Sequence, residues 1–298
     1  MTEQQKEALS GMAPVRFEDR MSRHTTFRVG GPAEAYVEPT LSQLKKLVSF
    51  AKEEGIPTIV LGNGSNILVK DEGLRGLVIV VGSPMGEIRV EGEEIVAGAG
   101  ALLSAVSAAA CEAGLSGLEF AGGIPGSVGG GVMMNAGAYG GELKDVLVEV
   151  DALSPDGRQV RTYDVSELEL SYRHSRFADS TGEIILAARF RLKPGDPGEI
   201  RRAVSELNRR RREKQPLEYP SAGSTFKRPK GHFAGKLIQD AGLAGFAIGG
   251  ARVSEKHCGF VINSGGASAA DILGVIAHVK EEVLRQSGVL LEEEVRIL

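Results

Sequence analysis

The spacing of apolar and polar residues along the chain predicts four helices. Their expected ranges are 41–54, 101–113, 199–214 and 269–286. The first has the clearest ends, because Thr40 and Gln43 have the spacing of a capping box and Gly55 follows the last apolar position. The second is rich in alanine and is expected to be buried, whereas the third carries many arginines.

Shorter apolar runs bounded by turn residues predict strands. The expected ranges are 58–61, 67–69, 77–81, 88–90, 94–97, 146–153, 158–162, 183–192 and 290–298. The first of these is expected to be buried. Two hairpins are expected, one about Gly92 and one around the Pro-Asp-Gly turn at 155–157. Helices and strands mixed in this way, with no internal repeat, indicate the α+β class.

The sequence Lys-Pro-Gly-Asp-Pro-Gly at 193–198 is the clearest linker in the chain. It indicates a domain boundary near residue 195, and a chain of 298 residues is long enough for two or three domains. Residues 1–20 are expected to form a loose or helical leader. Residues 21–195 would then form a first domain and residues 196–298 a second.

Composition and charge exclude several classes of function. The net charge of −4 argues against a general nucleic-acid partner, and 15 aromatic residues without tryptophan make a base-stacking platform improbable. We find no apolar signal segment and no apolar stretch of ~18 residues, so no membrane span is expected. Cys111 and Cys258 lie in no CxxC pair, which favours the reducing cytoplasm over a disulfide framework or a zinc cluster.

Several nucleotide and metal motifs are absent. No strict G-x-G-x-x-G occurs, so a Rossmann dinucleotide site is unsupported. The sequence GHFAGKL at 231–237 departs from a P-loop in its glycine spacing and in the Leu that follows Lys236. The five histidines show no metal-ligand spacing, and we expect no metal site.

Glycine is the compositional outlier, with 40 of 298 residues, and it gathers in two segments. In the loop LGNGSN at 61–66, backbone N–H groups can point into a concave nest that binds a diphosphate. A simple turn between two strands is an equal alternative. The segment 117–140 has nine glycines, which let a flat ligand lie close to the backbone; packed turns are its alternative. Pro125 would stiffen this segment, and Ser127 and Asn135 could hydrogen-bond the ligand. Two such segments together favour a dinucleotide cofactor.

Longer motifs in the same regions resemble known families. HTTFRVGGPAEAYVEP (24–39), LGNGSNILV (61–69) and GLEFAGGIPGSVGGGVMMNAGAYG (117–140) resemble the FAD-binding fold of the vanillyl-alcohol-oxidase type. The rest resembles the UDP-N-acetylenolpyruvoylglucosamine reductases, the MurB family, in its shorter type II form. The motifs that carry this resemblance are SYRHSRF (171–177), YPSAGSTFKRP (219–229), GKLIQDAGL (235–243), VSEKHCGFVIN (253–263) and LEEEVRIL (291–298).

The resemblance implies how the chain is organised. Residues 21–195 would form an FAD-binding domain of two α+β subdomains, split near residue 82. Residues 196–298 would form an α+β substrate-binding domain, with the last strand, 290–298, returning to the first lobe. The implied FAD contacts are Gly62, Asn63, Gly64, Ser65, Asn66, Gly123, Ile124, Pro125, Gly126, Ser127, Gly129, Gly130, Asn135, Gly137 and Ala138.

The resemblance also implies a reaction of peptidoglycan synthesis. NADPH would reduce bound FAD, which would then reduce the enolpyruvyl ether of a UDP-sugar to UDP-N-acetylmuramate. The partners would be these small molecules alone, and the protein would be a cytoplasmic monomer. The alternatives are another FAD-linked oxidase of this fold, acting on a sugar or lactone, and a flavin-binding protein without catalysis. The first fits the FAD motifs equally well but leaves SYR, AGSTF and LExEVR unexplained.

Three residues match the catalytic positions of the family. Arg173 would stabilise the charge that develops on the substrate carboxylate, Ser224 would deliver a proton to carbon, and Glu294 would orient the substrate or share a proton with it. Taken alone, each has a plainer interpretation: a surface ion pair, a turn residue and an exposed charge. Glu292 and Glu293 are near enough to be mistaken for Glu294. The lysines expected to meet the substrate diphosphate are Lys214, Lys227 and Lys236.

Overall fold

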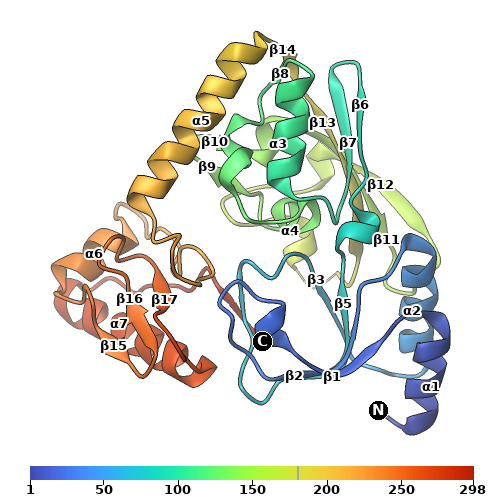
Figure 1. The fold of residues 1–298 in the computed structure, drawn as a ribbon, viewed down its shortest axis with the longest axis horizontal. Coiled ribbons are helices and arrows are strands. Elements are labelled where there is room, and N and C mark those ends of the chain that lie inside the picture. Colours follow the sequence, from blue (N-terminus) through green and yellow to red (C-terminus); the bar gives the residue numbers. More distant parts are fainter. Residues whose placement is uncertain (180) are drawn as a thin grey trace. The chain divides into compact units, whose positions relative to one another are not determined.

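The computed structural model describes residues 1–179 and 181–298 (Figure 1). Contacts along the chain divide it into two compact units. Unit 1 comprises Met1–Phe17, Glu34–Asn63 and Arg75–Arg210, and unit 2 comprises Glu18–Ala33, Gly64–Leu74 and Arg211–Leu298. Residues 21–33 and 64–74, which we predicted within the FAD-binding domain, therefore group with the C-terminal part of the chain. The predicted domain limits themselves stay a prediction.

Two helices and a four-stranded sheet form the beginning of the fold. The helices are α1 (Glu3–Met12) and α2 (Leu41–Glu53), and the sheet has the order β1-β2-β5-β3, with β1 (Arg16–Arg20), β2 (Pro32–Val37), β3 (Thr58–Leu61) and β5 (Leu74–Val80). The capping box predicted for α2 is confirmed, since Thr40 accepts a hydrogen bond from the Gln43 amide. The expectation that 58–61 is buried was wrong, because β3 is the edge strand of this sheet and its residues are exposed or half-buried.

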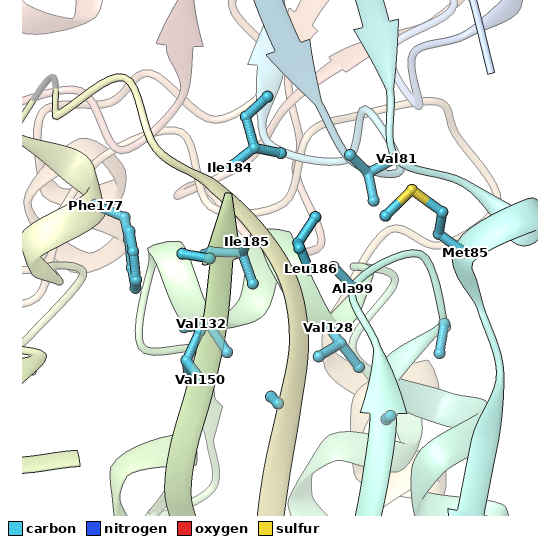
Figure 2. Packing of buried hydrophobic residues seen from close by; sticks show 14 of the residues in the cluster. Val81, Met85, Ala99, Val128, Val132, Val150, Phe177, Ile184, Ile185 and Leu186 are labelled. Atoms are coloured by element: carbon cyan, nitrogen blue, oxygen red, sulfur yellow. The ribbon is translucent and has the colours of Figure 1, made fainter. Parts of the chain in front are cut away.

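A five-stranded antiparallel sheet forms the centre of unit 1. Its order is β12-β11-β13-β7-β6, with β6 (Ile88–Glu91), β7 (Glu94–Gly98), β11 (Leu147–Leu153), β12 (Val160–Asp164) and β13 (Ile184–Arg191). Both predicted hairpins are confirmed, with Glu91 opposite Glu94 and Leu153 opposite Val160. Helices α3 (Leu103–Glu112) and α4 (Val128–Met133) pack on this sheet. Figure 2 shows Val128 and Val132 of α4 among the apolar side chains of the sheet.

Short elements complete unit 1. They are η2 (Ser83–Met85), β8 (Leu115–Ser116), η3 (Glu119–Gly123), β9 (Gly137–Ala138), β10 (Gly141–Glu142), η4 (Leu143–Asp145), η5 (Val165–Glu167), η6 (Arg176–Ala178) and β14 (Lys193–Pro194). The predicted linker 193–198 is structured, because β14 pairs with β8 and helix α5 (Pro197–Lys214) begins within it. The last of the changes from unit 1 to unit 2 along the chain comes after Arg210, inside α5.

Unit 2 combines a small sheet with two helices. The sheet is antiparallel and has the order β15-β16-β17, with β15 (Ala247–Ile248), β16 (Ala251–Val253) and β17 (Val261–Asn263). The sheet and helix α6 (Ala234–Asp240) both pack against helix α7 (Ala269–Ser287). The short helix η1 (Met21–Arg23) also lies in this unit. Apolar residues on one face of α7, such as Ile272 and Val279, are fully buried in the core. No helix in the described parts of the chain is both long and apolar enough to cross a membrane.

The segment 64–74 is hydrogen-bonded to the C-terminal part of unit 2. Asp71 accepts hydrogen bonds from the amides of Ala269 and Ala270, both at 3.0 Å, at the start of α7. Strand β4 (Ile67–Leu68) pairs in parallel with β18 (Arg296–Ile297). The strand predicted over 290–298 is thus confirmed at two residues only, and these contacts explain why 64–74 belongs to unit 2.

Candidate active site

Two glycine-rich loops of unit 1 meet at Gly62 and Asn63. The Asn63 side-chain amide donates a hydrogen bond to the carbonyl of Pro125 at 2.5 Å. A Cβ atom at Gly62 would lie 2.3 Å from the Ser127 hydroxyl oxygen, so glycine is needed for this approach. The structure therefore brings the first two predicted cofactor residues next to the segment 123–130, as a shared cofactor site requires.

The segment 123–130 is docked on the backbone that leads into α3. The amides of Val128 and Gly129 donate to the carbonyls of Ala101 and Ala99, at 2.8 and 2.9 Å. Ser127 is 2% exposed and caps α4 by accepting from the Gly130 amide at 3.4 Å. The Gly129 N–H is therefore used inside the protein. In this stretch, a Cβ atom at Gly130 would meet nothing closer than 3.6 Å.

The remainder of the first loop, Gly64–Asn66, lies in unit 2. Gly64 has a φ of +63°, and a Cβ atom there would lie 2.1 Å from the His24 carbonyl oxygen. Its own carbonyl accepts a hydrogen bond from the Thr26 amide at 3.1 Å. Ser65 is half-buried, and the side chain of Asn66 donates to the carbonyl of Glu294 at 3.0 Å. This part of the predicted cofactor loop is hydrogen-bonded to other segments of unit 2.

Asn135 is 1% exposed, and its side chain is fully engaged within unit 1. Its amide nitrogen donates to the Ser171 carbonyl at 3.1 Å and to the Glu142 carboxylate at 2.7 Å, and its oxygen accepts from the Lys144 amide at 3.0 Å. Gly137 and Ala138 form β9 and pair with β10. The backbone N–H of Asn135 is also used, since it donates to the Val132 carbonyl at 3.1 Å.

Arg173 stands in a tight turn of unit 1. Ser171 and His174 exchange two backbone hydrogen bonds of 3.2 Å, which leaves Tyr172 and Arg173 as the central residues. Arg173 has a φ of +57°, in the left-handed region that favours glycine. The hydroxyl of Ser175, which is fully buried, donates to the Met133 carbonyl at 2.8 Å and anchors the turn to α4. A strained arginine held this firmly is expected where its side chain has a function.

Ser224 is half-buried in unit 2, in a segment that is held on both sides. The next residue, Thr225, donates its amide to the Gly259 carbonyl at 2.8 Å, and its hydroxyl accepts from the Val261 amide at 2.9 Å. On the other side, the Thr225 carbonyl accepts a hydrogen bond of 2.8 Å from the Glu294 amide. Two predicted catalytic residues, far apart in the sequence, are thus brought next to one another.

The three glutamates before Val295 differ in their contacts. Glu293 forms a salt bridge with Lys280 of α7 at 2.7 Å, and the exposed Glu292 lies 3.4 Å from Lys227. Burial alone would raise the pKa of the Glu293 carboxyl, but the hydrogen bond from Lys280 holds that pKa below its ordinary value. Because Glu293 is bound to α7, the assignment of the catalytic role to Glu294 is favoured.

This salt bridge predicts a pH-dependent stability difference. Since the folded-state pKa of Glu293 is depressed, its stabilisation is present above the ordinary value of 4.5 and is lost as the pH falls through the folded-state pKa. Glu293→Gln is expected to lower the free energy of unfolding by roughly 1 kcal/mol at pH 7. Thermal unfolding at a series of pH values should show the difference shrinking as the pH falls below 4.5. Glu292→Gln is the control with little effect, and a difference independent of pH would contradict the assignment.

The predicted substrate lysines all lie in unit 2. Lys214 is exposed at the end of α5. The Lys227 ammonium is 3.4 Å from the Glu292 carboxylate, and Lys236 forms a salt bridge with Asp240 one turn along α6. A diphosphate that met Lys227 or Lys236 would therefore compete with a carboxylate. The contact of all three lysines with the substrate stays a prediction.

His257 and the two cysteines have plain structural interpretations. The ring Nδ1 of His257 accepts from the Gly259 amide at 3.1 Å, and burial lowers its pKa. Both cysteines are free and buried, and burial raises the pKa of the Cys258 thiol. Glu169, His174 and Asp179 bring ligand atoms within 4.8 Å of one another, but both carboxylates are exposed and we assign no metal to them.

Sequence reasoning missed the contacts that place these residues. Nothing in the sequence connects Asn66 with Glu294, which lie 228 positions apart, or Asn135 with Ser171. Both asparagines stand in glycine-rich loops, and we predicted them as cofactor contacts. A side chain's partner depends on tertiary packing, so the loop composition indicated the region and gave no signal for these particular hydrogen bonds.

Comparison with known proteins extends over nearly the whole chain. Residues 33–163 match the family described as FAD binding domain, and residues 215–298 match the C-terminal domain of UDP-N-acetylenolpyruvoylglucosamine reductase. The chain is 56% identical over 293 residues to that reductase of Agathobacter rectalis, covering 94% of this chain and 93% of the relative. It is 53% identical over 284 residues to the reductase of Clostridium beijerinckii, covering 95% and 92% of the two chains.

The fold is also similar to a solved structure. The crystal structure of the UDP-N-acetylenolpyruvylglucosamine reductase from Thermus caldophilus matches with a TM-score of 0.81 and 39% identity, and the match covers 96% of this chain and 98% of that one. The predicted α+β class, with an FAD-binding fold of the vanillyl-alcohol-oxidase type and a C-terminal domain, is confirmed. With this extent of identity, the chain belongs to the UDP-N-acetylenolpyruvoylglucosamine reductase family.

Proposed function

We propose that this chain is the NADPH- and FAD-dependent reductase that converts UDP-N-acetylglucosamine enolpyruvate to UDP-N-acetylmuramate in peptidoglycan synthesis. Family membership supports the reaction. The observation that supports the site is the 2.8 Å hydrogen bond from the Glu294 amide to the Thr225 carbonyl, because it joins the segment of the proposed acid Ser224 to the segment of the proposed carboxylate Glu294. We further infer a cytoplasmic monomer; the two free cysteines suit a reducing compartment.

The glycine-rich loops fit an FAD cofactor. Gly62 stands where a Cβ atom would displace Ser127, so the two loops can approach only without side chains at that point. Backbone N–H groups and the small polar residues around them are the donors that a diphosphate requires. When bound, FAD supplies two-electron transfer from NADPH to the enolpyruvyl double bond. We propose that the predicted FAD residues line this cofactor site. The side-chain donors of Asn66 and Asn135 and the backbone N–H groups of Gly129 and Asn135 are used within the protein, so these groups would not donate to the cofactor.

The chemistry of the substrate explains the three catalytic residue types. Reduction of a double bond next to a carboxylate leaves negative charge at C2 and on the carboxylate oxygens. Arg173 would hold that charge, since its planar guanidinium is always protonated and pairs with both oxygens. Ser224 would donate its hydroxyl proton to C2, because a carbanion is basic enough to take a proton from an alcohol. Glu294 would orient the substrate, and Lys214, Lys227 and Lys236 would meet its diphosphate.

A single spectroscopic experiment tests the proposal. Purified protein should be yellow or take up FAD, and anaerobic NADPH should bleach its flavin absorbance. The absorbance should then return on addition of UDP-N-acetylglucosamine enolpyruvate, with UDP-N-acetylmuramate detected as the product. Recovery with oxygen alone would indicate an oxidase of the same fold, and protein unable to bind FAD would overturn both activities.

Gly62→Ala is expected to weaken FAD binding. The new methyl group would lie 2.3 Å from the Ser127 hydroxyl and would force the two loops apart. Strain of this kind costs roughly 1–3 kcal/mol, which corresponds to about a 5- to 150-fold increase in the FAD dissociation constant. Flavin fluorescence titration of the apoprotein measures it.

Gly130→Ala is the matched variant. Its methyl group would meet no protein atom closer than 3.6 Å, so the apoprotein should be as stable as wild type. Loss of FAD affinity without loss of stability would then show that the cofactor itself lies against this position. Unchanged FAD affinity in both variants would contradict the proposed cofactor loops.

A further inference from the structure

Two asparagines of the glycine-rich loops bind backbone atoms next to proposed catalytic residues. In unit 2, the Asn66 side-chain amide donates to the Glu294 carbonyl at 3.0 Å. In unit 1, the Asn135 amide donates to the Ser171 carbonyl at 3.1 Å, at the start of the turn that carries Arg173. Both residues therefore use their side-chain donors within the protein.

Three hydrogen bonds hold the chain at and next to Glu294. Its amide donates to the Thr225 carbonyl, and its carbonyl accepts from the Asn66 side chain. Two residues later, the Arg296 amide donates to the Asn66 carbonyl at 3.0 Å, where β18 pairs with β4. Asn66 thus bonds the terminal segment on both sides of Val295. Other backbone hydrogen bonds hold the ends of this segment, among them those of the Lys227 amide to the Glu292 carbonyl and of the Leu298 amide to the Leu68 carbonyl. At Glu294 itself, the backbone carbonyl is bonded by the Asn66 side chain.

Asn135 holds the Arg173 turn in a similar way. Its amide nitrogen bonds Ser171, and its oxygen accepts from Lys144, so the side chain joins the turn to the segment that follows β10. It is 1% exposed, which keeps water from replacing these hydrogen bonds. Arg173 has a left-handed backbone conformation, which persists only when its surroundings hold it.

We propose that Asn66 and Asn135 are positioning residues, Asn66 for Glu294 and Asn135 for the turn of Arg173. The proposal rests on the proposed function, because it takes the roles of these two residues as given. Each asparagine connects a cofactor loop to a segment that carries a catalytic side chain. Loss of either side-chain donor is therefore expected to disturb the chemistry on the sugar substrate more than the binding or reduction of FAD.

The test uses Asn66→Asp and Asn135→Ala, which remove the side-chain donor. Alanine is chosen at position 135 because an aspartate there would face the Glu142 carboxylate. Both variants should retain FAD and be reduced by NADPH within about threefold of the wild-type rate. Reoxidation by UDP-N-acetylglucosamine enolpyruvate should slow roughly 10- to 100-fold, the effect of a displacement of about 1 Å at the reacting centre. Anaerobic stopped-flow absorbance of the flavin separates the two half-reactions.

Asn263→Asp is the matched control. The Asn263 amide also donates to a backbone carbonyl of unit 2, that of Phe27 at 3.1 Å, but no proposed catalytic residue lies there. It should lower the thermal unfolding temperature without slowing reoxidation selectively. A variant of Asn66 or Asn135 that loses FAD, slows both half-reactions equally or slows neither overturns the proposal.

A parallel Ser224→Ala sample separates this inference from the proposed function. If Ser224→Ala leaves reoxidation by the UDP-sugar unchanged, the proposed catalytic site itself fails. If Ser224→Ala slows reoxidation and the asparagine variants do not, the catalytic site stands and the positioning roles are wrong. Selective slowing in all three variants supports both.

Discussion

Ser224→Ala is expected to slow reoxidation of the reduced flavin by the enolpyruvyl UDP-sugar by about 10²- to 10⁴-fold, the usual contribution of a positioned general acid. Reduction by NADPH should stay within about twofold of wild type, because only the second half-reaction needs a proton at carbon. The fold should be retained, since Thr225 and not Ser224 makes the hydrogen bonds to Val261 and Glu294. Anaerobic stopped-flow absorbance measures both rates.

Ser221→Ala is the control for this prediction. Ser221 lies three residues earlier in the same segment and forms an isolated bridge with Ile262, which uses backbone atoms only. Its variant should behave as wild type in both half-reactions. If Ser224→Ala slows both half-reactions equally, the serine acts in binding or folding, and the proton must come from another group.

Elements with local signals were predictable from the sequence, and elements defined by distant pairing were not. Helix α2 begins where the capping box of Thr40 and Gln43 places it, and β6 and β7 turn about Gly92 as the spacing predicts. By contrast, β3 is exposed because it is an edge strand, which depends on the order of strands in the sheet. The terminal segment forms strand only where β4 lies beside it, which the apolar pattern of 290–298 does not reveal.

The candidate site shows the same division. The composition of two loops indicated a dinucleotide site, and longer motifs indicated Arg173, Ser224 and Glu294. The spacing of the terminal motif already favoured Glu294 over its two neighbours, whereas the salt bridge of Glu293 with Lys280 is a tertiary contact that the sequence did not reveal. The hydrogen bond from the Asn66 side chain to the Glu294 carbonyl could not be predicted from the sequence either. Residue type predicts chemistry, whereas the partner that orients the side chain follows from the fold.

Arg173→Gly is expected to reduce the rate of reoxidation by about 10²- to 10³-fold without destabilising the protein, since removal of one donor to a developing charge has an effect of this size. Arg173 has a φ of +57°, and such a conformation costs a non-glycine residue about 1–2 kcal/mol. Glycine relieves this strain but loses more entropy on folding, by roughly 0.5–1 kcal/mol. The free energy of unfolding should therefore be maintained or rise by up to about 1.5 kcal/mol.

Glu169→Gly is the matched control for Arg173→Gly. Glu169 also has a left-handed φ, of +51°, it is exposed, and we assign it no part in the chemistry. Its variant should match the stability of Arg173→Gly in urea unfolding while keeping full activity.

Arg173→Lys should recover little activity, because an ammonium group cannot pair with both carboxylate oxygens in one plane. If Arg173→Gly remained active, the strain at this turn would have no catalytic reason; if it unfolded, the arginine would serve the fold. The combination of lost activity with retained stability is the signature of a residue kept for its chemistry at the expense of its backbone conformation.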